Sequence, residues 1–189
     1  MRFKKKKGEG KFLKNKKSQV WIETAIYTLI GLVIIAILLA AAKPQIEKIK
    51  DKGIISQTVE AMNLLNNKIS EAEQAAGASR EIKFSVAKGR LEINASGDII
   101  QYIMEDTRLE LSESNETIRE GDIFILTKER GSRFDIILTM DYTDRLDMTF
   151  KDEEKTGVLQ AGTTPYRIIV ENIGDNSPTE DTHIDFSLI

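Results

Sequence analysis

The chain has 189 residues, with 27 Lys and Arg against 30 Asp and Glu, one His and no Cys. These numbers exclude disulfide bonds, thiolate metal sites and a zinc site built from several histidines. The charge is also segregated, because residues 1–18 carry nine bases and one acid, whereas the rest of the chain carries eleven more acids than bases. An acidic folded part argues against nucleic-acid binding by that part.

An apolar segment follows the basic cluster. Residues 25–42 contain no charged residue, and residues 20–42 contain only one, Glu23. At about 1.5 Å per helical residue, residues 20–42 span roughly 34 Å, enough to cross a hydrocarbon core about 30 Å thick. Because basic residues stay on the cytoplasmic side, we expect a single-pass membrane protein with a cytoplasmic N-terminus and an extracytoplasmic C-terminal domain.

Two simpler interpretations of this segment stay open. Ala40-Ala41-Ala42 offers a cleavage site for a secretory signal peptide before Lys43, although the apolar run is longer than the usual length of about 7–15 residues. The segment also fits a plain single-span anchor, since any such helix would take the same orientation.

The junction between the basic cluster and the apolar segment carries a motif. Residues 16–23 read Lys-Lys-Ser-Gln-Val-Trp-Ile-Glu, so a small residue follows the bases and a glutamate stands four residues after Gln19. This resembles the class III signal peptide of type IV prepilins, most closely that of archaeal pilin-like proteins. The resemblance implies that a prepilin peptidase cuts between Ser18 and Gln19, removes the leader 1–18 and leaves Glu23 as the fifth residue.

Glu23 is the candidate assembly residue. A carboxylate at mid-bilayer costs about 2.5–3.5 kcal/mol, so an ionisable residue inside an apolar run is a functional candidate by default. Cleavage would expose an α-amino group on Gln19, and Glu23 of the same or a neighbouring chain could pair with it in a dry helical bundle. The alternative is that Glu23 is merely favoured by the helix dipole in the first turn.

Beyond the transmembrane helix, expected over residues 19–43, Pro44 should kink the helix or start a new one. Apolar residues then recur at steps of three and four, which predicts an amphipathic helix over 44–77 with Gly77 as its C-cap. The apolar positions of this helix are Ile46, Ile49, Ile55, Val59, Met62, Leu65, Ile69, Ala72 and Ala76.

Residues 78–189 switch to an alternating pattern with frequent turn signals. They predict an extracytoplasmic antiparallel β-sheet or small β-sandwich, and the fold class is therefore α+β. Strands are expected near residues 82–86, 91–93, 99–104, 109–111, 123–126, 134–140, 146–150, 166–170 and 184–188. The aromatic residues expected in the core are Phe84, Tyr102, Phe124, Phe134, Tyr142, Phe150, Tyr166 and Phe186.

Few residues of this part suggest chemistry. The acidic groups Asp141, Asp144, Asp147 and Asp175, Glu180, Asp181 lack the spacing of an EF-hand loop, and His183, beside Asp181 and Asp185, lacks a second histidine. No phosphate-binding loop or nucleophile elbow occurs, so we expect no metal, no cofactor and no enzymatic activity.

Two sequons lie in expected turns on the extracytoplasmic side. They begin at Asn94 and Asn115, and both are candidate N-glycosylation sites. The alternative is that these asparagines serve only turn formation.

We therefore expect a structural subunit, a type IV pilin-like protein or minor pseudopilin that polymerises through its N-terminal helix into a surface filament or secretion-type assembly. Its partners would be membrane lipid, the prepilin peptidase and other pilin-like subunits, with no nucleic acid bound by the β-domain. The alternative is a single-span anchored β-domain that binds a ligand or partner without polymerising.

Overall fold

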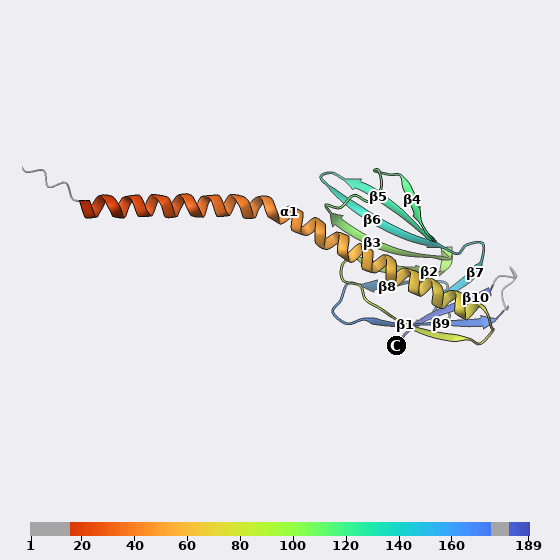
Figure 1. Ribbon diagram of the computed structural model, residues 1–189. Coiled ribbons are helices and arrows are strands. Elements are labelled where there is room, and N and C mark those ends of the chain that lie inside the picture. Colours follow the sequence, from red (N-terminus) through yellow and green to blue (C-terminus); the bar gives the residue numbers. More distant parts are fainter. Residues whose placement is uncertain (1–15, 175–181) are drawn as a thin grey trace, which may run out of the picture. The chain divides into compact units, whose positions relative to one another are not determined.

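The structure is a computed structural model that describes residues 16–174 and 182–189, so most of the basic leader lies outside the described residues. The chain forms two compact units, Met1–Lys43 and Pro44–Ile189. We call the second unit the folded domain. One long helix, α1 (Lys16–Glu73), contributes to both units, and it is followed by ten strands (Figure 1). The expected α+β fold, with a long apolar N-terminal helix before a β-rich part, is confirmed.

The strands form two sheets. The six-stranded sheet has the order β4-β5-β6-β3-β2-β8, and the four-stranded sheet has the order β1-β9-β10-β7. Their bounds are β1 (Ser79–Phe84), β2 (Arg90–Asn94), β3 (Ile99–Thr107), β4 (Thr117–Glu120), β5 (Ile123–Arg130), β6 (Arg133–Asp141), β7 (Leu146–Phe150), β8 (Thr156–Gln160), β9 (Tyr166–Gly174) and β10 (Thr182–Leu188). A short 3₁₀ helix, η1 (Ala95–Gly97), follows β2.

All neighbouring strand pairs are antiparallel except β7 and β10, which pair in parallel. The expectation of an antiparallel domain therefore holds for nearly all of the pairing. Parallel strands need a long connection between them. Strands β8 and β9 lie between β7 and β10 in the chain and provide this connection.

The second part of α1 packs against the sheets through one face. Its buried apolar residues are spaced by seven, three, four and three residues, which keeps them on one side of the helix: Ile55, Met62, Leu65, Ile69 and Ala72. They join residues of both sheets in one core. The predicted amphipathic helix is thus present, but it ends at Glu73 rather than at residue 77. Gly77, with φ 76°, lies in the turn beyond the helix and is not its C-cap.

Three residues of the predicted apolar stripe are exposed: Ile46, Ile49 and Ala76, the last of which lies beyond the end of α1. Ile46 and Ile49 are 51% and 71% exposed. Ile49 stands six residues before Ile55, about 240° around an ideal helix, so it points away from the sheets when Ile55 points towards them.

The core also differs from expectation at the aromatic residues. Five of the eight are buried: Phe84, Tyr102, Tyr142, Phe150 and Phe186. The other three, Phe124, Phe134 and Tyr166, are half-buried. Leu109 is buried although it lies in a loop rather than in the strand expected near residues 109–111, and strands β4 and β8 were not predicted.

Candidate functional site

The side chains of the apolar part of α1 are exposed in the described part of the chain. Of the residues from Val20 to Lys43, all are exposed except the half-buried Gly31. Trp21 and Leu39, for example, are 81% and 65% exposed. The helix is long and apolar enough to cross a membrane. So much exposed apolar surface requires lipid or other protein around it.

The two threonines of this segment bond to the helix itself. The hydroxyl of Thr24 donates to the carbonyl of Val20 at 2.9 Å, and that of Thr28 donates to the carbonyl of Thr24 at 2.8 Å. Such bonds to the preceding turn allow hydroxyl side chains to lie in an apolar environment. Among residues 20–42, Glu23 is the one that carries a formal charge.

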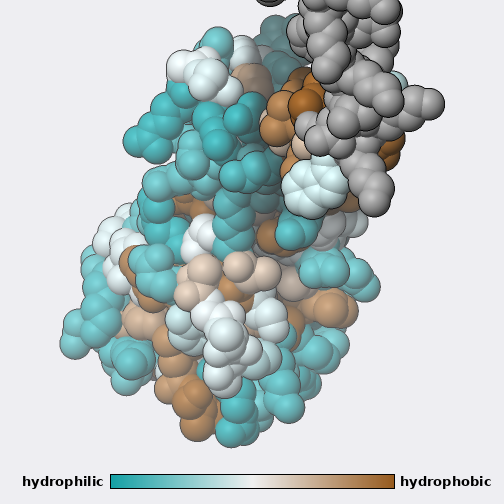
Figure 2. All heavy atoms as spheres, turned by 90° about the vertical axis from the view of Figure 1, so that its left-hand side faces the viewer, coloured by the Kyte–Doolittle hydropathy of each residue, from teal (hydrophilic) through white to brown (hydrophobic). Residues whose placement is uncertain are grey.

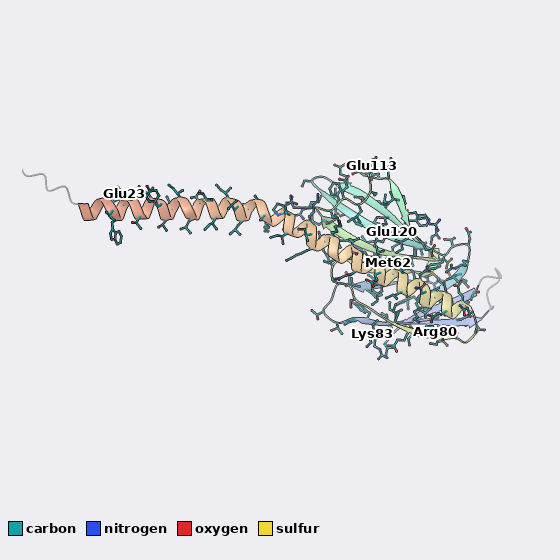
Figure 3. The ribbon with its side chains drawn as sticks, in the orientation of Figure 1. Glu23, Met62, Arg80, Lys83, Glu113 and Glu120 are labelled. Carbon is teal, nitrogen blue, oxygen red and sulfur yellow. The ribbon has the colours of Figure 1, made fainter. Side chains whose placement is uncertain are left out.

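Ser18, Gln19 and Glu23 all lie in the first turns of α1. Gln19 and Glu23 are four residues apart, so they occupy one face of the helix on successive turns. The side chains of Ser18 and Gln19 fall outside the described residues, whereas Glu23 is exposed near the N-terminal end of the helix (Figure 3). An α-amino group on Gln19 would therefore lie one turn from the Glu23 carboxylate.

Pro44 lies inside α1, which continues through it as one helix. Proline lacks the amide hydrogen that would bond to the carbonyl four residues before, so one bond of the helical ladder is missing at this point. The chain thus enters the folded domain without a Gly- or Ser-rich linker, and the helix that carries the apolar segment also supplies part of the domain core.

The two sequons differ in their surroundings. Asn115 is exposed, with φ 65°, and its backbone amide donates to the carbonyl of Thr127 at 2.8 Å. Asn94 is half-buried at the end of β2, where its side-chain oxygen accepts a bond from the hydroxyl of Thr156 at 3.4 Å. The Ser96 hydroxyl of the same sequon donates to the carbonyl of Glu154 at 3.1 Å.

The folded domain has a polar cavity of about 320 Å³ between α1 and the six-stranded sheet. Buried Tyr142 forms part of its wall and donates its hydroxyl to the Asn66 side chain at 2.9 Å, and Asn66 donates to Asp122 at 3.0 Å. Burial raises the pKa of the Tyr142 phenol well above its ordinary value. The cavity is lined by Asn66, Arg119, Asp122, Phe124, Met140, Asp141, Tyr142, Thr143, Asp144 and Arg145.

Sequence reasoning did not find a polar cluster on the paired strands β7 and β10. The Thr149 hydroxyl donates to Asp185 Oδ1 at 2.8 Å and lies 3.1 Å from His183 Nε2, while His183 Nδ1 lies 3.3 Å from Asp147 Oδ2. The contacts run from Thr149 to His183 to Asp147, the same order as nucleophile, base and acid in a hydrolase triad. However, Thr149 and Asp185 are each only 7% exposed, and the hydroxyl proton is directed at the carboxylate. The cluster therefore holds two strands together rather than presenting a nucleophile.

The alternation of side chains could have shown that Asp147 and Thr149 share one face of their strand. It could not show that β10 lies beside β7. His183 thus pairs with Asp147 rather than with the neighbouring acids in sequence. Within residues 16–174 and 182–189, no three His, Asp or Glu side chains converge in a way that could hold a metal ion.

A second buried polar group joins α1 to the sheets. Asp51 accepts bonds from Lys88 Nζ at 2.8 Å and from the Thr107 hydroxyl at 2.6 Å. A bulge between Met104 and Thr107 shifts the alternation of β3, so that Thr107 is buried like the even-numbered residues before it. This group fixes the helix on the domain and offers no free functional atom.

No protein-family model, curated protein or solved structure matches this chain.

Proposed function

We propose that the chain is a type IV pilin-like subunit or minor pseudopilin, which inserts into the cell membrane with its N-terminus in the cytoplasm and polymerises through α1 after removal of the leader. The observation that carries this proposal is the continuity of α1. The helix has an exposed apolar part from Val20 to Lys43, and it supplies core residues to the folded domain further along.

This continuity supports a subunit over an anchored module. The apolar segment and the residues that join the core of the folded domain belong to one helix, with no Gly- or Ser-rich stretch between them. A binding module on a flexible tether would have such a stretch.

The basic leader and Glu23 fit the same function. Residues 1–18 would orient the precursor, and a peptidase that cuts after Ser18 would expose the amino group of Gln19. In a bundle of apolar helices, this amino group needs a counter-charge. Glu23 lies one helical turn away and supplies it, either within one chain or between neighbours.

The test is the N-terminus of the protein extracted from native membranes, together with the distribution of the protein between membrane and sheared extracellular fractions. We expect a mature protein that begins at Gln19, keeps its apolar helix and appears in the sheared fraction. A protein that begins at Lys43 would instead be a secreted product of a signal peptidase, and the proposal would be wrong.

The cavity at Asn66 and Tyr142 favours a second candidate function, an anchored domain that binds a small polar ligand. Its walls combine carboxylates, guanidinium groups and an amide with two aromatic rings, a mixture typical of sites for polar ligands. Under this alternative the precursor would stay unprocessed, and the protein would remain entirely in the membrane fraction.

A further inference from the structure

Four lysines follow the apolar segment within ten residues: Lys43, Lys48, Lys50 and Lys52. We call them the lysine cluster. All four are exposed, and no residue in the described part of the chain forms an ion pair with any of them. They stand out because acids exceed bases in the rest of the folded domain.

The acids that interrupt the cluster are already neutralised from within the folded domain. Glu47 accepts a bond from Arg108 at 3.3 Å and lies 3.9 Å from an Arg133 nitrogen. Asp51 is buried and paired with Lys88. Within residues 16–174 and 182–189, no acid therefore pairs with the lysine cluster, and its charge is directed at the surroundings.

Apolar side chains lie among these lysines. Ile46 and Ile49 were expected in the core and are exposed. A helix that presents lysines and large apolar side chains together is typical of the boundary between hydrocarbon and headgroups. Close by is a cavity of about 200 Å³, lined by Pro44, Gln45, Lys48, Arg108 and Ser132.

The spacing fits the depth of a headgroup layer. Lys48 and Lys52 follow Lys43 by five and nine residues of α1, which is at most about 7.5 and 13.5 Å of helix, however the helix bends at Pro44. The polar layer outside the hydrocarbon core is about 5–8 Å deep, and the field of an anionic surface extends about another 8 Å in physiological salt. The whole lysine cluster thus falls within reach of headgroup charge when the apolar segment spans the core.

We propose that the lysine cluster, together with Ile46 and Ile49, binds the anionic headgroups of the leaflet from which the folded domain emerges. The occupant is a phospholipid surface, because unpaired lysines and exposed isoleucines lie directly after a membrane-spanning length of helix. This inference depends on the membrane insertion in the proposed function, but not on processing or polymerisation.

The experiment uses the full chain in vesicles of phosphatidylcholine alone or of phosphatidylcholine with phosphatidylglycerol. A membrane-impermeant amine reagent is added, and the modification of each lysine is measured by mass spectrometry. We expect modification of Lys48, Lys50 and Lys52 to fall at least about threefold when phosphatidylglycerol is present, and to recover at high salt. Lys68 and Lys155, which pair with Glu71 and Glu153, serve as internal controls and should not change.

A triple variant provides the matched comparison. Lys48→Gln, Lys50→Gln and Lys52→Gln together should reduce the number of phosphatidylglycerol molecules that native mass spectrometry finds on the detergent-extracted protein. The equal charge change Lys68→Gln, Lys151→Gln and Lys155→Gln should not. Equal modification in both vesicle types, or equal lipid retention by the two triple variants, would overturn the proposal.

Two further outcomes would also overturn it. Modification of the lysines could instead fall as the density of protein in the vesicles rises and be independent of phosphatidylglycerol. This result would show that the lysine cluster faces the acidic surface of a second copy. A chain that is removed from vesicles by alkaline carbonate would not be inserted at all. The latter result would remove the proposed function as well, whereas failure of the lipid dependence alone would leave it standing.

Discussion

Asp51 on α1 and Lys88 in the turn between β1 and β2 form a salt bridge in which Lys88 Nζ lies 2.8 Å from both carboxylate oxygens. The Asp51 side chain is 9% exposed and that of Lys88 is 35% exposed. The Tyr102 hydroxyl donates to the backbone carbonyl of Lys88, so both the backbone and the side chain of this residue are held. The pair joins the long helix to the sheet at the start of the folded domain.

The first prediction is that Lys88→Met destabilises the full chain in detergent by about 1–3 kcal/mol, because it leaves a nearly buried carboxylate with one hydroxyl partner, Thr107. Thermal or denaturant unfolding measures the change. Asp51→Asn should recover part of the loss when it is combined with Lys88→Met, since the amide carries no charge to be left unpaired.

The control for this prediction is Lys68→Met. It breaks the Lys68–Glu71 pair, whose side chains are 36% and 43% exposed, and it should cost about 0–1 kcal/mol. Equal effects of the two lysine substitutions would show that the Asp51–Lys88 pair contributes no more than an exposed one.

The second prediction concerns Gly89, the residue after Lys88. It has φ 77°, and a side-chain carbon there would collide with the backbone carbonyl of Ile103 on β3. We expect Gly89→Ala to cost clearly more than the about 1 kcal/mol of a left-handed alanine. Gly121→Ala is the matched control, because Gly121 has φ 62° but open space around its α-carbon. Similar losses in unfolding free energy would contradict the close approach at Gly89.

Much of this fold follows from local pattern. The three- and four-residue spacing of Met62, Leu65 and Ile69 identified the buried face of α1, and alternation identified strands such as β3 and β6. The prediction wrongly included Ile46 and Ile49 in the buried face. The spacing of apolar residues does not show where along the helix the sheets begin to cover it.

The strands that were missed have physical reasons. Every residue of β4 is exposed, so it shows no alternation of burial. In β8, Gly157 was interpreted as a turn residue. The Phe150 ring in fact occupies the space that a side chain at residue 157 would need. Glycine thus permits close packing inside a strand. The cluster of Thr149 and His183 depends on the β7–β10 pairing, a long-range contact that no local pattern contains.

The third prediction is a loss of stability at high pH through Tyr102. Burial is the main cause that raises the pKa of its phenol from 10.0 to about 12, with a smaller contribution from the Asp51 charge. The unfolded chain therefore ionises first. The stabilising effect of the neutral phenol is present below pH 10 and is lost as the pH rises through about 12.

Denaturant unfolding of the full chain at several values between pH 9 and about 12 measures this effect. Tyr102→Phe should be less stable at neutral pH, because it loses the bond to the Lys88 carbonyl, but it should show a shallower decline with alkali. Tyr27→Phe, at a position that is 73% exposed, is the matched tyrosine substitution. Parallel declines of parent and Tyr102→Phe would contradict the prediction.

The fourth prediction is that Asn115 is modified and Asn94 is not when the chain passes through an N-glycosylating secretory pathway. Asn115 and Thr117 are both exposed, whereas Asn94 is half-buried and Ser96 has donated its hydroxyl to Glu154. Glycopeptide mass spectrometry checks this. Asn115→Gln should remove the modification, and Asn94→Gln should leave it in place. A glycan at Asn94 alone would show that accessibility does not determine which sequon is glycosylated.

The last prediction is that Glu23→Ala abolishes assembly without impairing insertion. Insertion should be at least as efficient as in the parent, because the substitution removes the one charge from the apolar segment. In an assembly, however, the amino group of Gln19 would lose its counter-charge in a dry bundle. Removal of one member of a buried pair costs about 3–5 kcal/mol, equivalent to more than about a hundredfold in an association constant.

The measurement compares sheared extracellular material with membrane fractions for the parent, Glu23→Ala and Thr28→Ala. Thr28 lies in the same apolar segment and bonds only to the carbonyl of Thr24, so its loss should leave assembly intact. Glu23→Gln separates charge from shape and should fail like Glu23→Ala. Normal assembly of Glu23→Gln would mean that a hydrogen bond suffices and that charge neutralisation is not the role of this residue. The folded domain should unfold at the same temperature in all four proteins, because Glu23 and Thr28 lie outside its core.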